Sequence, residues 1–472
     1  MKMGILSIIL AMSANLVASE YLVEFFHTDD AALKQFTLSH GGKLNLVSKA
    51  GKLYKWTLDT DTNALQVRDS NLAHVEKNST IRLIENPSIT KNQDAIRELL
   101  RTNQLQITDG PAYPDNPEIP NKVSQSSGKD PLLGKQWGIN QIKGISAQNN
   151  SPQGKDIIIA VTDTGVDYTH QDLVNQMWRN PKEIPGNGID DDSNGYVDDI
   201  VGWDFASNDN KPYDLSLNLI DILMGGGNPG HGTHVAGVIG AAANNSVGMV
   251  GIAPNVKIMA LRFITEKGQG SSENAIKAID YAVDNGAKII NASWGGEKGE
   301  EKEEELLKAI ERARDKGVIF VAAAGNGRLN QAKQKAEGYN NDTDPKPILP
   351  ATFNVENMLT VAAIDVNQKI GEFSNFGPKS VHLAAPGVAI LSSVPGNRYQ
   401  DTIIELGQMK VTWDGTSMAT PHVVGAAALL WSIDPGMSFS EVKTKLLEMT
   451  VKVSGLEKKT ITGGRLDLGA VR

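Results

Sequence analysis

Three residues of the chain have the side-chain types that hydrolysis by a serine requires. Asp163 follows an apolar run, His231 lies among glycines, and Ser417 precedes an apolar run typical of a helix. A serine hydroxyl is a weak nucleophile, so a neutral imidazole must take its proton. A buried carboxylate must then orient the imidazole and offset its charge. The three residues lie 68 (163 to 231) and 186 (231 to 417) positions apart, so only a folded chain brings them together.

Asn326 is a fourth candidate, because its side-chain amide can donate a hydrogen bond to a developing oxyanion. It follows the apolar run 318–324 through Gly325. The backbone N–H groups at the start of the helix expected near Ser417 would donate to the same oxyanion. Each of these residues alone has a simpler role, as a turn residue, in packing or as a helix cap. Their joint occurrence favours catalysis.

The elements that must position these residues alternate between strand and helix from about residue 130 onward. Apolar runs at 157–161, 287–291 and 318–322 predict buried strands. A helix capped by Ser271 or Ser272 precedes the second strand, and a charged amphipathic helix precedes the third. This rhythm predicts an α/β fold with a doubly wound, mostly parallel sheet, whose sites form at the carboxyl ends of the strands.

Four motifs surround the candidate residues: Ala160–Val166, Gly230–Gly237 around His231, Ala323–Asn326 and Gly415–His422. They make the chain resemble the subtilisin-like serine proteases, or subtilase family, over about residues 131–472. The resemblance implies a subtilisin-like catalytic domain and a serine endopeptidase that hydrolyses peptide bonds through an acyl-enzyme. It further implies that Asp163, His231 and Ser417 form the catalytic triad and that Asn326 donates to the oxyanion.

The resemblance also implies where substrates bind. Ser293, Trp294 and Gly295 would pair with the substrate backbone and wall the S1 pocket, and Ala324 and Gly325 would form the other wall. A protein or peptide substrate would then be held as an added strand, with pockets reading alternate side chains. The P1 preference is not predicted by these residues.

The segment Leu215–Pro229 departs from the family pattern, in which the chain usually runs quickly into the histidine motif. It is apolar and leads directly into His231. Two interpretations stay open, a small packed helix or a segment that lines or covers the substrate cleft.

An acidic stretch places oxygen ligands at every second position, with glycine at the sixth. This pattern is typical of a loop that binds a calcium ion (Ca²⁺) for structural purposes. The alternative is a merely acidic turn, and Asp199 could replace the last ligand. The predicted ligands are Asp190, Asp192, Asn194 and Asp198 by side chain and Tyr196 by its carbonyl.

The N-terminal part of the chain divides into three predicted segments. Residues 1–19 have a positive start, an apolar run and small residues suited to signal peptidase. Residues 20–88 predict a small α+β domain of the split βαβ, ferredoxin-like type, with a second helix over Asn63–Glu76 and a last strand over Ile81–Ile84. This domain resembles the family's inhibitory, folding-assisting propeptide, and residues 89–130 form a polar linker before the catalytic domain.

The composition of the chain excludes several other classes of function and site. The 46 basic and 55 acidic side chains give a net charge of −9, which argues against nucleic-acid binding, and the absence of Cys excludes disulfides and thiolate sites. We expect a secreted or periplasmic monomer with no stable membrane span after signal cleavage. The zymogen would process itself and would have its own propeptide as an intramolecular inhibitor. The alternative functions are a catalytically idle, calcium-dependent binding protein on a protease scaffold and an aspartic protease using Asp163.

Overall fold

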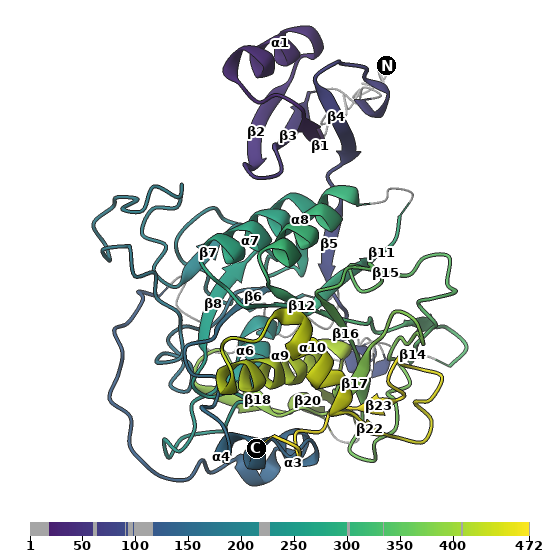
Figure 1. Ribbon diagram of the computed structural model, residues 1–472. Coiled ribbons are helices and arrows are strands. Elements are labelled where there is room, and N and C mark those ends of the chain that lie inside the picture. The colour runs from purple at the N-terminus through teal and green to yellow at the C-terminus, as the bar shows by residue number, and fades with distance from the viewer. Residues whose placement is uncertain are drawn as a thin grey trace, which may run out of the picture. The chain divides into compact units, whose positions relative to one another are not determined.

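The computed structural model describes residues 18–59, 64–89, 91–92, 98, 117–216, 227–299, 303–333, 335–406 and 409–471 (Figure 1). The chain divides into two compact units, Met1–Asn78 and Ser79–Arg472. The division lies ten residues before the boundary expected at residue 88. The predicted signal segment lies outside the described residues, apart from Ala18 and Ser19. Among the residues that are described, no helix is both long and apolar enough to cross a membrane.

The first unit is an antiparallel sheet with one helix, in the strand order β2-β3-β1-β4. This is the order of the split βαβ fold that the sequence predicted. Its core is aromatic: the ring of Phe36 packs edge-on against Phe25 and Trp56, with centroids 4.9 and 5.1 Å away. Its elements are β1 (Ser19–Phe25), α1 (Asp30–His40), β2 (Lys43–Ser48), β3 (Leu53–Leu58), η1 (Ala64–Gln66) and β4 (Leu72–Lys77).

Two expectations for this unit were wrong. The helix predicted over Asn63–Glu76 is only the short turn η1, and Leu72–Lys77 is a strand paired with β1. Leu72 and Val75 pack on the aromatic core from this strand, so tertiary packing outweighs the helical propensity of the segment. The strand predicted at Ile81–Ile84 exists as β5 (Thr80–Leu83), but it belongs to the second unit.

The second unit is built on a large, mostly parallel sheet, as the alternating pattern predicted (Figure 1). The described strands run in the order β22-β23-β17-β16-β12-β10-β6-β8-β7, and all neighbours pair in parallel except β22 with β23. They are β6 (Ile158–Asp163), β7 (Gly202–Asp204), β8 (Lys257–Arg262), β10 (Ile289–Ala292), β12 (Ile319–Ala323), β16 (Met358–Ile364), β17 (Leu383–Pro386), β22 (Val451–Lys452) and β23 (Gly464–Arg465).

Helices cover both faces of this sheet (Figure 1). α7 and α8 lie on one face and α6 and α9 on the other, with α10 beside α9. α7 begins where the sequence predicted, because the Ser271 side chain accepts a hydrogen bond from the N–H of Asn274. The helices are α3 (Trp137–Gln141), α4 (Gly144–Asn149), α6 (His231–Gly240), α7 (Ser272–Asp284), α8 (Glu304–Asp315), α9 (Thr416–Ile433), α10 (Phe439–Glu448) and the turn η2 (Leu133–Lys135).

Smaller sheets lie at the rim of the large one. One has the order β15-β11-β5-β9, so it joins a strand from early in the chain to three strands of the α/β region. Three hairpins complete the unit. The rim strands are β5, β9 (Gln269–Ser271), β11 (Trp294–Glu297), β15 (Ile348–Leu349), β13 (Arg328–Asn330), β14 (Lys335–Glu337), β18 (Ser392–Val394), β19 (Arg398–Gln400), β20 (Thr402–Leu406) and β21 (Met409–Thr412).

Candidate active site

Asp163 and His231 meet as the sequence predicted. Asp163 is the last residue of β6, and His231 is the first residue of α6. The Nδ1 atom of His231 lies 2.7 Å from Oδ1 of Asp163, and both side chains are buried. Gly232 permits this contact, because a Cβ there would lie 2.0 Å from the carbonyl oxygen of Gly165. A buried carboxylate that contacts Nδ1 holds the imidazole in one orientation, and the other ring nitrogen, Nε2, is then left for a second partner.

The first turn of α6 is held by side chains that the sequence reasoning did not single out. The Oδ1 of Asn228 accepts from the N–H groups of Gly230 and His231, at 2.8 and 2.7 Å. The Oγ1 of Thr164 accepts from Gly232 at 3.0 Å. A helix leaves its first N–H groups without internal partners. Asn228 lies just before the histidine motif and Thr164 lies within the motif of Asp163, and together they satisfy these N–H groups.

One buried carboxylate, Asp214, joins these supports. Its Oδ1 accepts from Thr164 Oγ1 at 2.8 Å and from Asn228 Nδ2 at 2.5 Å, and its Oδ2 accepts from the backbone N–H of Thr233 at 2.8 Å. Burial raises the pKa of Asp214 to about 6, although every one of these hydrogen bonds favours the charged form. Asp214 therefore fixes the residues that follow Asp163 and the turn that carries His231.

Ser417 lies near the start of α9 and is buried. Its Oγ donates to the carbonyl of Ser293 at 3.0 Å, and the Oγ of Ser293 donates back to the carbonyl of Ser417 at 3.0 Å. The second bond has a local cause: Pro421 has no N–H to offer the Ser417 carbonyl four residues earlier. Within the described residues, Nε2 of His231 has no hydrogen-bond partner, so the Ser417 hydroxyl does not donate to that nitrogen here.

Asn326 follows β12 and bridges to the start of α9. Its Oδ1 accepts from the backbone N–H and the Oγ1 of Thr416, at 2.8 and 2.9 Å. These bonds fix the amide so that its Nδ2 donates outward, to the carbonyl oxygen of Glu85 at 2.9 Å. Gly415 keeps the approach open, since a Cβ there would lie 3.0 Å from that Nδ2. A carbonyl from elsewhere in the chain thus occupies the position expected for an oxyanion.

The residues expected to hold a substrate strand do hold a strand, and it is the chain's own. β11 pairs antiparallel with β5, with Trp294 opposite Leu83 and Gly295 opposite Arg82. β9 pairs with the other edge of β5, and the N–H of Leu83 donates to the carbonyl of Gly268 at 2.9 Å. β5 is therefore paired through its backbone with a strand on each edge.

The remaining expected wall residues, Ala324 and Gly325, directly precede Asn326, which contacts Glu85 just past the end of β5. Ala324 is fully buried, and its carbonyl accepts from Asn341 Nδ2 at 2.8 Å. The N–H of Gly325 donates to Thr416 Oγ1 at 3.1 Å, which ties the wall to the start of α9. Of the apolar segment Leu215–Pro229, residues 217–226 lie outside the described residues, while Asn228 joins the two ends through its bond to the Leu215 carbonyl at 2.8 Å.

His234, three residues after His231, has a structural role. Its Nε2 contacts the carbonyl oxygen of Ile390 at 2.8 Å, and its ring stacks on Trp413 at 4.2 Å between centroids. Burial lowers the pKa of His234 to about 3, so the ring is neutral.

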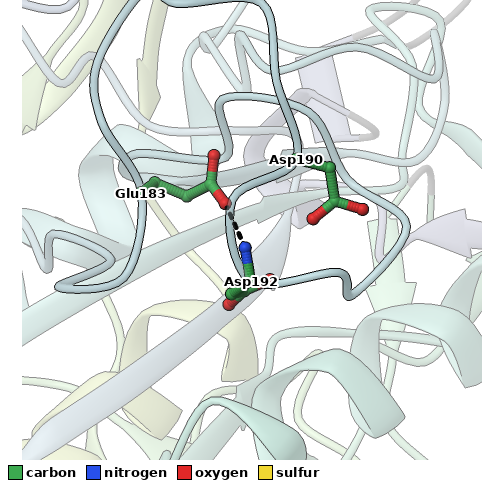
Figure 2. A group of neighbouring side chains, drawn as sticks. All are labelled: Glu183, Asp190 and Asp192. Carbon is green, nitrogen blue, oxygen red and sulfur yellow. Dashed lines mark hydrogen bonds between the residues drawn. The ribbon is translucent and has the colours of Figure 1, made fainter.

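The acidic stretch forms a loop in which carboxylates converge (Figure 2). One oxygen from each of Glu183, Asp190 and Asp192 lies within 4.8 Å of the others. Glu183 was missed by the sequence reasoning because it precedes the ligand pattern. It is buried, and its Oε1 accepts from the N–H groups of Asp191 and Asp192 at 2.9 and 3.2 Å. Burial raises the pKa of Glu183, and neighbouring acids add to this effect.

Of the other expected ligands, the Asp198 carboxylate lies apart from this group. It accepts from the N–H groups of residues 186–188 at 2.8, 3.2 and 2.9 Å. Asp199, the expected substitute, accepts from Asn180, Asn194 and Tyr281. The Oδ1 of Asn194 accepts from the N–H of Tyr196 at 2.8 Å. The geometry thus supports a site centred on Glu183, Asp190 and Asp192.

Comparison with known proteins identifies the chain's relatives. Residues 154–463 match the model of the Subtilase family. The chain is 34% identical over 334 residues to "Subtilisin-like protease 2" of Plasmodium falciparum (isolate 3D7), covering 69% of this chain and 21% of that protein. It is 30% identical over 461 residues to the "Thermophilic serine proteinase" of Bacillus sp. (strain AK1), covering 96% of this chain and 94% of that protein.

A solved structure shares the fold. Fervidolysin from Fervidobacterium pennivorans, a keratinolytic enzyme related to subtilisin, superposes with a TM-score of 0.66 over 97% of this chain and 61% of that one, at 23% identity. The chain spans about a fifth of the Plasmodium relative and nearly all of the Bacillus relative. With the family model covering residues 154–463, the chain belongs to the subtilase family of subtilisin-like serine proteases.

Proposed function

We propose that the protein is a serine endopeptidase in which Ser417, His231 and Asp163 hydrolyse peptide bonds. The single observation that carries this proposal is the Asn326 amide, which donates to a peptide carbonyl at the end of a strand clamped by β11 and β9. A carbonyl so held is polarised toward attack. The buried Asp163–His231 pair, at 2.7 Å, supplies the base.

The steps follow from the groups present. The Ser417 hydroxyl turns from the Ser293 carbonyl to Nε2 of His231, gives up its proton there and attacks the carbonyl carbon. The oxyanion is held by the Nδ2 of Asn326, while Asp163 offsets the imidazolium charge. His231 then protonates the leaving amine, and water, activated by the same imidazole, releases the acyl group.

A fluorophosphonate probe tests this proposal, because it modifies only an activated serine. The chain should be labelled at Ser417 once the segment before Asn86 has been cut and removed, and the Ser417→Ala variant treated in the same way should not be labelled. Folded full chain that takes no label, even after its N-terminal segment has been removed, would favour an idle binding scaffold instead.

The protein is further proposed to be a zymogen that cuts itself between Glu85 and Asn86. Two observations support this: β5 occupies the substrate-strand position, and the Glu85 carbonyl accepts from Asn326. A strand paired on both edges excludes a competing substrate, so the uncut chain is inhibited.

The first unit is also proposed to assist the folding of the second. The test compares the refolding yield of residues 79–472 carrying Ser417→Ala with and without residues 18–78 added in trans. Equal yields would remove the folding role of the first unit.

A calcium ion is proposed for the acidic loop. Three carboxylates within 4.8 Å of one another supply the hard oxygen ligands that this ion prefers. The Lys182 ammonium lies 3.7 Å from Asp192 and is mostly exposed. Glu183, Asp190 and Asp192 would hold the ion. It would neutralise their mutual repulsion and brace a chain that has no Cys.

Export to the periplasm or medium is proposed from the charged start and apolar run of residues 1–19. Fractionation of cells that express the full chain, with N-terminal sequencing of the product, tests it. Full-length protein that stays in the cytoplasm would contradict export.

A further inference from the structure

The residues immediately after Glu85 contact the rest of the protein through their side chains. Asn86 is half-buried and donates from Nδ2 to the carbonyl of Thr412 at 3.0 Å. Ser88 is buried, and its Oγ accepts from the N–H of Thr412, also at 3.0 Å. Thr412 ends β21, which within the described residues pairs with β20 alone. The carbonyl of Thr412 also accepts from the N–H of Asp414 at 3.0 Å. Side chains of the bound segment thus contact both the N–H and the carbonyl of one residue on the strand edge.

This contrasts with the strand before Glu85, where β5 is held by its backbone. A backbone ladder accepts almost any side chain, because every residue offers the same N–H and C=O groups. Asn86 and Ser88 instead contact Thr412 through side-chain atoms, a donor amide and an acceptor hydroxyl. Recognition of this kind depends on residue type, so it selects sequence.

The local conformation explains why side chains make the contact. Residues 87–89 are helical, and the Oδ1 of Asn86 accepts from the N–H of Ser88 at 2.8 Å, as an N-cap does. Pro87 occupies the first helical position, where its missing N–H is not needed. A helical turn directs its backbone groups along its own axis, which leaves the side chains to reach β21.

We propose that the edge of β21 at Thr412 is a specificity subsite for the leaving side of the scissile bond. It selects asparagine directly after that bond and serine two residues later, presented in a helical turn. The ligand class is a polypeptide with an Asn-x-Ser turn at that place, in this chain or in a separate substrate. This inference rests on the proposed endopeptidase function and on cleavage after Glu85.

The test compares self-cleavage rates of refolded full chain carrying changes at Asn86. Asn86→Asp is nearly isosteric and keeps a good N-cap acceptor, but it removes the donor to Thr412. We expect it to slow cleavage about 10-fold, the size of one lost hydrogen bond, and Asn86→Ala to slow it at least as much. Ser88→Ala should also slow cleavage about 10-fold, while Ser88→Thr keeps the acceptor and should retain most of the rate. The exposed Asn121→Ala and Ser124→Ala are matched controls.

The same comparison in trans guards against a rate set by refolding. Processed enzyme is given synthetic peptides of residues 79–92 with Asn or Asp at position 86, and kcat/KM should differ about 10-fold. Equal rates for Asn86→Asp and wild type, in cis and in trans, would overturn the subsite and leave the endopeptidase standing. Wild type that neither cleaves itself nor takes the fluorophosphonate label would overturn both.

Discussion

The carboxylates near His231 and those of the acidic loop differ in what surrounds them. Around His231, Asp214 accepts hydrogen bonds from Thr164, Asn228 and Thr233, all neutral donors. In the loop of Figure 2, the carboxylates of Glu183, Asp190 and Asp192 also accept from backbone N–H groups, but they converge on one another as well. The loop therefore gathers like charges that a cation would relieve.

This difference indicates which carboxylates affect the chemistry and which affect the stability of the fold. Near His231, Asp163 orients the imidazole and Asp214 fixes the turn that carries it, so changes there should alter the chemistry. Carboxylates that face one another in a surface loop store repulsion, so changes there should alter stability and leave the chemistry alone. The following predictions separate the two, in order of expected effect.

The largest effect is expected from a matched pair of Asp→Asn changes. Asp163→Asn should lower kcat about 10⁴-fold, because the imidazole loses its orienting acceptor and takes the wrong tautomer. Asp192→Asn should leave kcat unchanged at saturating calcium. Peptide hydrolysis by the processed variants measures both. A similar loss of kcat in the two variants would erase the distinction between the two groups.

Asn326→Ala should lower kcat by about 100- to 1,000-fold, the loss known for one oxyanion donor in a protease of this family, with little change in KM. The reason is that the Nδ2 contact to the bound carbonyl, 2.9 Å here, strengthens as charge develops. Steady-state kinetics measure the effect, with the exposed Asn121→Ala as control. Turnover near that of wild type would remove Asn326 from the oxyanion site.

Asp214 predicts a pH dependence of stability. Its folded pKa of about 6 lies above the ordinary value of 3.8, so the folded chain binds the proton more tightly than the unfolded chain does. The stabilisation is therefore fully present below about pH 4 and is lost as pH rises through 6, at up to about 1.4 kcal/mol per pH unit.

Urea unfolding of the Ser417→Ala chain between pH 4.5 and 6.5 measures this slope without self-digestion. Adding Asp214→Asn, which no longer titrates, should make the stability profile flatter over the same window. An identical slope with and without Asp214 would show that other groups carry it.

The smallest effect is expected in the acidic loop. Chelation should lower Tm by about 5 °C, because an ion at 100 times its Kd stabilises the fold by about 2.7 kcal/mol. Asp192→Ala and Glu183→Ala should each mimic chelation and remove most of its further effect, whereas the exposed Glu356→Ala should not. Calorimetry with chelator and with excess calcium measures it, and an unchanged Tm would leave the loop an acidic turn.

The sequence predicted the α/β scaffold well because its signals are local. Ser271 caps α7, and the apolar runs become the central strands β6, β10 and β12. The pairing of Asp163 with His231 followed from family motifs. These features depend on short segments whose composition determines their structure.

What the sequence could not predict depends on contacts between distant segments. Asp214 is one more acidic residue in the sequence, and only the folded chain places it against Thr164 and Thr233, 50 and 19 positions away. The last strand of the expected small domain satisfies its edges on β11 and β9 instead. The residue pattern of β5 predicts a strand, but it does not show whether that strand pairs within the small domain or with β11 and β9.

The most direct test of the central claim is N-terminal sequencing of refolded full chain, wild type beside Ser417→Ala. If β5 lies in the substrate position and Ser417 performs the cut, wild type will yield a new N terminus at Asn86, and the variant will keep its bond between Glu85 and Asn86. The account is contradicted if the variant yields the same new terminus, or if wild type stays uncut at this bond.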